Sequence, residues 1–137
     1  MAPGDRGLST IMKFLCVICA EKVMEQMSDA EAARHYEEYR EFTDAIRASG
    51  HLVDCNRLTP PASATTLRVR NGQVSTTDGP FAETREVFGG YYLIETRDLA
   101  EALGIAARIP GAKKGCVEVR EVAEDAETRT ALGRPVR

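Results

Sequence analysis

Several features that would point to a specialised class of protein are missing from this sequence of 137 residues. It contains no tryptophan and only two histidines, and aromatic residues make up 6% of it. Its net charge is −3, from 18 basic and 21 acidic residues that are interspersed along the chain. A nucleic-acid-binding surface normally needs a basic patch or stripe. We therefore expect no direct contact with DNA or RNA.

Long hydrophobic runs are also missing. The longest one, Phe14 to Ala20, is far shorter than the roughly 20 residues that a transmembrane helix needs. Residues 1–11 lack the long apolar stretch of a secretory signal. We interpret them as a flexible leader, with Met12 as an alternative start. These observations predict a cytoplasmic protein, outside the membrane, whose cysteines stay reduced.

Sets of metal ligands are scarce. Cys16 and Cys19 have the C-x-x-C spacing of redox and metal sites, but Cys55 and Cys116 do not supply the second close pair that zinc would want. In a strand, residues three positions apart point to opposite faces. We interpret all four cysteines as buried structural thiols, and we expect no metal and no cofactor.

The composition that is present, 43% apolar and 28% charged, is that of an ordinary globular domain. An apolar run at 12–19 predicts a strand covered on both faces. A capping box formed by Ser28 and Glu31 predicts the start of a helix, which ends at about Ser49 because Gly50 suits a helix C-terminus. The expected apolar stripe of this helix consists of Ala32, Tyr36, Tyr39, Phe42 (or Thr43) and Ile46.

A β-hairpin is the clearest local prediction in the second half of the chain. Residues 65–70 alternate between apolar and polar side chains, as a strand with one buried face does. The pair Asn71–Gly72 favours a tight turn in which both residues have positive φ. Residues 73–77 then form the return strand.

The remaining elements complete a β-α-β-β-α-β order around this hairpin. Further strands are predicted at 51–58, 89–96 and 116–122, and a second helix begins at Asp98 and stops before Pro110. Its expected apolar face consists of Leu99, Ala102, Leu103, Ala106 and Ile109.

This order predicts a ferredoxin-like α+β fold with an inserted hairpin and an antiparallel sheet. Two helices cover one face of such a sheet, and a second copy of the chain would cover the other face, which predicts a homodimer. The domain is expected to span 12–122, followed by a tail at 123–137 that is loose or docked on a partner.

The loop from Asp78 to Thr84 is the most informative segment for function. Its sequence, DGPFAET, joins a carboxylate, a flexible glycine, a rigid proline and an aromatic ring. Loops held by a rigid scaffold commonly carry function. Asp-Gly-Pro is equally ordinary turn chemistry, in which Phe81 would only fill the core. Both interpretations stay open on residue types alone.

Residues 59–95, together with DLAEALGIAARIPG and VEVREV further on, resemble the DGPF proteins of the YCII-related family. The resemblance extends from Met12 to about Val122 and rests on the motifs Asp78-Gly79-Pro80-Phe81 and Gly89-Gly90-Tyr91-Tyr92. It implies a ferredoxin-like fold assembled as a dimeric α+β barrel, which agrees with the element order above.

The resemblance implies less about activity. Many members have no assigned reaction, and some YCII-like relatives are lactone-processing or dehalogenating enzymes that pair a helix histidine with an aspartate. The position that matches this histidine holds Tyr39, and His35 lies one turn earlier, so the chain departs from that dyad. Other members occur beside, or fused to, sigma-factor-like regulators, which makes such a regulator a candidate partner.

Asp78 and His51 are the residues that we predict for acid–base chemistry. Partial burial beside an aromatic ring can suit a carboxylate to proton transfer, and an imidazole titrates near neutral pH. The predicted binding residues are Gly79, Pro80, Phe81, Glu83 and Arg68. An arginine can hold a carboxylate ligand through two hydrogen bonds. The structural alternatives are a surface ion pair of Arg68 with Glu95 or Glu118 and a local turn around Glu83.

Two functions remain open, and a purely structural interpretation stands beside them. The first is a module that binds a small metabolite or serves a regulator. The alternative is a cofactor-free enzyme that uses Asp78 for acid–base chemistry on a small lactone or carbonyl compound. In the structural interpretation, the DGPF motif only sets a turn at the dimer interface.

Overall fold

A computed structural model of the protein describes residues 11–21, 27–79 and 86–136. Its centre is a four-stranded sheet built from β1 (Met12–Glu21), β2 (Leu52–Arg57), β5 (Glu86–Thr96) and β6 (Gly115–Glu121). The strand order is β2-β5-β1-β6, and each neighbouring pair is antiparallel. With the inserted hairpin set aside, the element order is β-α-β-β-α-β. The predicted ferredoxin-like α+β fold is therefore confirmed.

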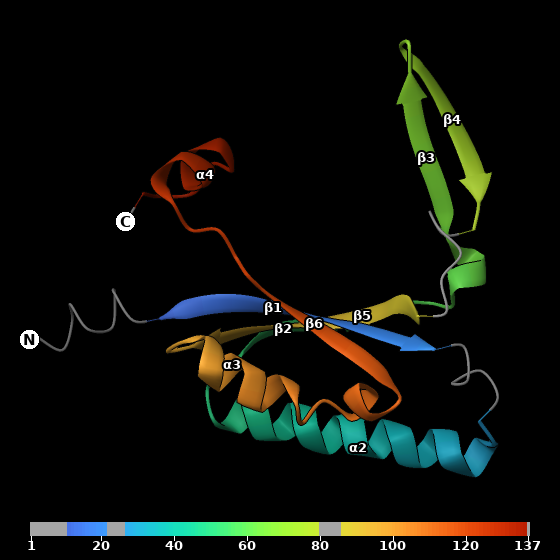
Figure 1. The fold of residues 1–137 in the computed structure, drawn as a ribbon, viewed down its shortest axis with the longest axis vertical. Coiled ribbons are helices and arrows are strands. Elements are labelled where there is room, and N and C mark those ends of the chain that lie inside the picture. The colour runs from blue at the N-terminus through green and yellow to red at the C-terminus, as the bar shows by residue number, and fades with distance from the viewer. Residues whose placement is uncertain (1–10, 22–26, 80–85, 137) are drawn as a thin grey trace, which may run out of the picture.

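Two helices, α2 (Asp29–Ala48) and α3 (Leu99–Ala106), lie on one face of this sheet (Figure 1). The Ser28 side chain accepts a hydrogen bond from the Glu31 N–H, and Asp98 accepts one from the Glu101 N–H, so both predicted N-caps are confirmed. Gly50, with a φ of 84°, follows the end of α2, where an L-residue would be strained.

The core lies between the helices and one face of the sheet. Alternation along β1 buries Phe14, Cys16 and Ile18 against the helices and leaves Leu15 and Val17 half-buried on the other face. The buried apolar side chains are Phe14, Cys16, Ile18, Phe42, Ile46, Tyr92, Ile94, Ala102, Ile105, Ala106 and Ile109. We call the face that carries Leu15 and Val17 the open face of the sheet.

The buried faces of both helices differ from the sequence prediction. On α2, His35 is buried and 7% exposed, whereas Tyr36 is 52% exposed. On α3, Ile105 is buried, whereas Leu99 and Leu103 are about half exposed. The buried positions still follow three- and four-residue steps, but the α2 stripe passes through a histidine, which a count of apolar residues leaves out.

The cysteines are distributed over both faces of the sheet. All four are thiols, and none is in a disulfide. Cys16 is fully buried, Cys19 and Cys55 are partly buried, and Cys116 is exposed. The prediction of four buried thiols is therefore wrong for Cys116, because this residue lies on the solvent side of edge strand β6.

The predicted hairpin forms a separate two-stranded sheet of β3 (Thr65–Arg70) and β4 (Gln73–Asp78). It follows the short 3₁₀ turn η2 (Pro61–Ser63) and rises from the open side of the main sheet (Figure 1). Asn71 and Gly72 have φ angles of 52° and 74°, which confirms the predicted turn.

Two short elements complete the chain. The 3₁₀ turn η3 (Pro110–Lys113) joins α3 to β6, and α4 (Ala126–Ala131) lies in the C-terminal segment, where the sequence pattern indicated no helix. Asp125 caps α4, and the buried Arg129 guanidinium contacts Glu124 and donates to the Pro135 carbonyl. In the described part of the chain, no helix is long and apolar enough to cross a membrane.

Candidate functional site

Asp78 closes the hairpin at its base. It pairs with Thr65 in the β3–β4 ladder, and its side chain is exposed. The next residue, Gly79, has a φ of 99°, and its N–H donates to the Ala64 carbonyl at 2.7 Å. The Gly79 carbonyl accepts from the Thr66 hydroxyl at 2.8 Å. These bonds fix the backbone beside Asp78 and leave its side chain at the surface.

Of the other predicted binding residues, only some belong to the part of the chain that the structure describes. Pro80, Phe81 and Glu83 lie outside the described residues. Arg68 is half-buried on β3, directly opposite Ser75 of β4. It belongs to the same hairpin as Asp78, so the structure places these two predicted residues on one element.

His51 lies at the other end of β2 from the hairpin. Its Nδ1 is 2.7 Å from the Ser49 hydroxyl, and its Nε2 is 3.5 Å from a Glu101 carboxylate oxygen. Hydrogen bonds from the backbone and side chain of Arg97, with a smaller contribution from His51, hold the pKa of Glu101 below its usual value. Because β2 separates His51 from the hairpin, the structure does not bring His51 and Asp78 together.

Helix α2 holds a packing contact at Tyr39, the position that the family resemblance matches to a helix histidine of some YCII-like enzymes. The Tyr39 hydroxyl accepts a hydrogen bond from the Gly111 N–H at 3.0 Å, and burial raises the pKa of Tyr39 to about 12. The His35 ring lies edge-on to Tyr39, with ring centroids 4.9 Å apart. Burial also lowers the pKa of His35. Both side chains therefore contribute to the core in an uncharged form near neutral pH.

A polar cluster that the sequence analysis missed lies on the open face of the sheet. The Tyr91 hydroxyl donates to an Asp54 carboxylate oxygen at 3.1 Å and accepts from the Asn56 side-chain amide at 2.8 Å. Asp54 and Asn56 are alternate residues of β2, and Asn56 is directly opposite Tyr91 of β5. We call these three residues the Tyr91 cluster.

Apolar side chains lie beside the Tyr91 cluster. Leu15 and Leu93 are direct cross-strand partners at the centre of the sheet, and Val17 is the partner of Tyr91. All three side chains are only half-buried. The open face therefore combines an apolar centre with a fixed set of hydrogen-bonding groups at one edge. The neighbouring residue Tyr92 points to the opposite face of the sheet and lies in the core.

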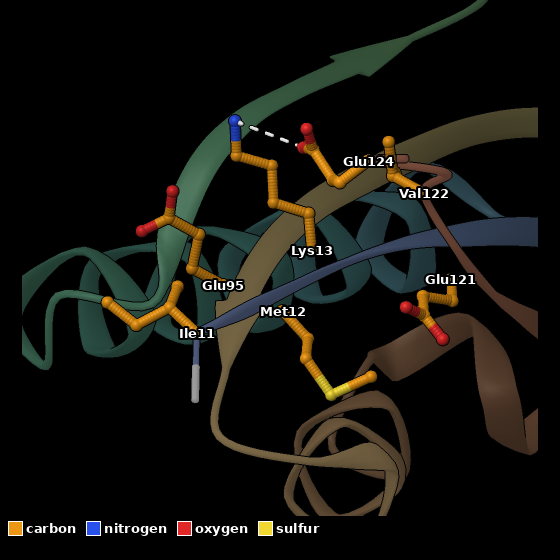
Figure 2. A pocket seen from close by; sticks show the side chains of 7 residues that line it. All are labelled: Ile11, Met12, Lys13, Glu95, Glu121, Val122 and Glu124. Atoms are coloured by element: carbon orange, nitrogen blue, oxygen red, sulfur yellow. Dashed lines mark ion pairs between the residues drawn. The ribbon is translucent and has the colours of Figure 1, made fainter. Parts of the chain in front are cut away.

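A small hollow of about 190 Å³ lies at the start of β1 (Figure 2). The Lys13 ammonium and the Glu124 carboxylate lie 3.9 Å apart at its rim. Its lining residues are Ile11, Met12, Lys13, Glu95, Glu121, Val122 and Glu124. Of the predicted site residues that the structure describes, none lines it. Within residues 11–21, 27–79 and 86–136, no group of three or more histidine, cysteine, aspartate or glutamate side chains is placed to hold a metal ion.

Comparison with known proteins gives a family and one uncharacterised relative. The family model described as the YCII-related domain matches residues 12–125. An uncharacterised protein of Rhizobium meliloti (strain 1021) is 37% identical over 105 residues, which cover 75% of each chain. The name of this relative states no activity, so these comparisons show the family and do not identify a function.

Proposed function

Because the chain belongs to the YCII-related family, we propose that it is a small-metabolite-binding module that works as a homodimer and holds its ligand on the open face of the sheet. The observation that carries this proposal is the Tyr91 cluster beside the apolar pair Leu15 and Leu93. Ligand sites typically combine apolar walls with a few polar groups that fix orientation. A second copy of the chain would close the site from above.

The Tyr91 cluster determines which ligand chemistry we propose. The Asp54 carboxylate accepts hydrogen bonds, and the Asn56 amide both donates and accepts. A compound with a hydroxyl or carbonyl group and a short apolar body would satisfy both parts of the face. Small lactones and hydroxylated carboxylates have this chemistry.

The geometry supports binding better than catalysis. A general base must lie within hydrogen-bond reach of the proton that it removes, and a dyad needs its two members side by side. Asp78 is exposed on the hairpin, and β2 separates it from His51. The position that the resemblance matches to the helix histidine of some YCII-like enzymes holds Tyr39, whose hydroxyl accepts a hydrogen bond from the Gly111 N–H. A regulatory role, with the ligand controlling contact with a sigma-factor-type partner, is compatible with this proposal and rests on the family resemblance.

The test is an NMR titration of the protein with a panel of small lactones and hydroxycarboxylates. We expect backbone amide shifts that centre on Val17, Tyr91 and Leu93 for at least one compound. Tyr91→Phe removes the hydroxyl from the cluster and should lower the affinity for that compound roughly tenfold. This change corresponds to the loss of one or two hydrogen bonds. The matched control is Tyr36→Phe, since Tyr36 is exposed on α2. This variant should bind the compound as tightly as the unmodified protein does.

Two results would overturn the binding proposal. One is a panel in which no compound shifts the open-face amides. The other is turnover of a lactone that is retained in Tyr91→Phe and lost in Asp78→Asn. The second result would instead support the cofactor-free enzyme, with Asp78 as its acid–base group.

A further inference from the structure

Cys19 faces Cys116 in the sheet. The C-x-x-C spacing in the sequence would instead associate Cys19 with Cys16. The register of β1 with β6 places Cys19 directly opposite Cys116. Cys16, in contrast, has Tyr92 and Val119 as its cross-strand partners and lies in the core. Two thiols far apart in the sequence are thus direct neighbours in the sheet.

Both members of this pair lie on the open face. Val117 and Val119 of β6 pack toward the core, so Cys116 between Gly115 and Val117 points the other way, and it is exposed. Cys19 is partly buried. Directly opposed residues on antiparallel strands share a face, and an oxidant that reaches Cys116 from solvent therefore meets a second thiol beside it.

The Cα spacing of the two strands lies within the range of disulfides, and a small approach of the strands would bring the two side chains within bonding reach. The Val122 N–H donates to the Lys13 carbonyl, which makes these two residues a hydrogen-bonded pair of the ladder. Such pairs alternate with non-bonded ones, and an even number of steps leads from Lys13 to Cys19, so Cys19 and Cys116 also form a hydrogen-bonded pair. Their Cα atoms are then about 5.5 Å apart, within the range of roughly 4.4–6.8 Å that disulfides span. Directly opposed Cβ atoms of such a pair lie about 5.5 Å apart, so the edge strand β6 must move about 1 Å toward β1 to reach the roughly 3.5–4.5 Å of a disulfide.

We propose that Cys19 and Cys116 form a redox site in which a hydroperoxide converts the two thiols into a disulfide that joins β1 to β6. The Cys116 thiolate attacks the peroxide, the O–O bond breaks, and Cys116 becomes a sulfenic acid as the alcohol, or water from hydrogen peroxide, leaves. Cys19 then attacks the Cys116 sulfur, the S–S bond forms, and water leaves. The two thiols lose two protons and two electrons, and the peroxide is reduced.

The other two cysteines lack these conditions. Burial raises the pKa of Cys16 to about 11, so its thiol stays protonated inside the core. Cys55 lies opposite Tyr92 of β5 and packs against the core. Among the described cysteines, only Cys19 and Cys116 face each other across a ladder.

The position of this pair suggests what its oxidation changes. Cys19 is also the partner of Phe88 in β5, at the point where the β1–β5 register shifts. Nearby, the Leu58 N–H donates to the Gly89 carbonyl, where the chain leaves β2 for the hairpin that carries Asp78. A disulfide here fastens the end of the sheet from which the hairpin rises. It also crosslinks a long stretch of chain, and longer closed loops gain more stability.

The experiment is treatment of the full chain with hydrogen peroxide, followed by intact mass measurement and trypsin mapping. Trypsin places Cys16 and Cys19 in peptide 14–22 and Cys116 in peptide 115–120. We expect the monomer mass to fall by two hydrogens, a crosslink from Cys19 to Cys116 in the fragment spectra, and recovery of both peptides after dithiothreitol. The oxidised protein should also melt at a higher temperature than the reduced one.

Matched variants separate this site from general thiol oxidation. Cys116→Ser, at an exposed position, should lose both the crosslink and the rise in melting temperature, and Cys55→Ser should keep both. A crosslink between Cys16 and Cys19, a Cys116 disulfide between two chains, or oxidation only to sulfinic acid would overturn the proposal. Because the readouts are mass and melting temperature, the proposal can fail or succeed independently of metabolite binding.

Discussion

At the scale of single residues, His35 shows how a buried polar group ties stability to pH. Its side chain is 7% exposed, and its Nε2 is buried and has no hydrogen-bond partner among residues 11–21, 27–79 and 86–136. Burial is the main cause that lowers its pKa from 6.5; the positive charge of Lys114 adds to this effect and the negative charge of Glu38 opposes it. The folded protein therefore prefers the neutral imidazole more strongly than the unfolded chain does.

This preference predicts a loss of stability in weak acid. The pKa of His35 in the unfolded chain is 6.5. Above this pH, His35 is neutral in both the folded and the unfolded protein, and its contribution to the free energy of unfolding is fully present. As the pH falls below that value, the unfolded chain binds a proton before the folded one, so the free energy of unfolding decreases. Urea unfolding should show a lower midpoint at about pH 5 than at about pH 7.5. His35→Leu should flatten this dependence, whereas His51→Gln should retain it; equal slopes in both variants would contradict the assignment.

At the scale of elements, the contact between α2 and η3 depends on a position without a side chain. The Gly111 N–H donates to Tyr39 of α2. A Cβ at Gly111 would lie 2.5 Å from the Tyr39 hydroxyl and 2.9 Å from the Ile18 Cγ2 atom. Tyr39 is fixed by its burial and its hydrogen bond, so it has little room to move.

We expect Gly111→Ala to destabilise the fold by about 1–3 kcal/mol, the usual cost of an overpacked core. The control is Gly104→Ala on α3, where a Cβ would meet nothing within 4 Å. Alanine is a better helix former than glycine, so this change should stabilise by about 0.5–1 kcal/mol. Urea unfolding of the two variants measures both values. Equal effects would mean that the α2–η3 contact does not constrain the chain.

The elements also show what sequence reasoning can and cannot reach. The turn at Asn71–Gly72 was predictable because its backbone conformation depends on those two residues alone. The Ser28 and Asp98 caps are local in the same way. The prediction of the buried faces of α2 and α3 was partly wrong because packing against the sheet decides which helix residues are buried. A histidine on the buried stripe also carries no hydrophobic signal.

The candidate site was harder to predict than the elements. The Tyr91 cluster depends on the pairing of Asn56 with Tyr91, and the β2–β5 register shifts between Leu52 and Asp54. No spacing in the sequence encodes such an irregularity. Cys19 and Cys116 were missed for the same reason, because only the β1–β6 register joins them. Asp78 and Arg68 were easier to group, since one hairpin holds both.

At the scale of the whole molecule, the described residues of one chain leave both the open face and the hairpin uncovered. Leu67, Val69 and Val74 of the hairpin are 59%, 50% and 64% exposed. An isolated two-stranded hairpin is marginally stable in water, and Leu15 and Leu93 are half-buried at the centre of the open face. We propose that a second copy covers the hairpin and the apolar centre of the open face and leaves the edge strand β6 with Cys116 exposed, since a two-fold dimer lets each chain supply the same patch to the other.

This proposal predicts a dimer in solution that a charge on the open face disrupts. Light scattering coupled to size exclusion should give twice the chain mass of 15.0 kDa for the unmodified protein. Leu93→Glu should give monomers with an unchanged circular dichroism spectrum, because a carboxylate at the centre of an apolar interface loses its hydration. Leu103→Glu is the matched control, since Leu103 is 50% exposed on α3, away from the open face. A monomeric unmodified protein, or a Leu93→Glu dimer, would mean that a partner other than a second copy covers the open face.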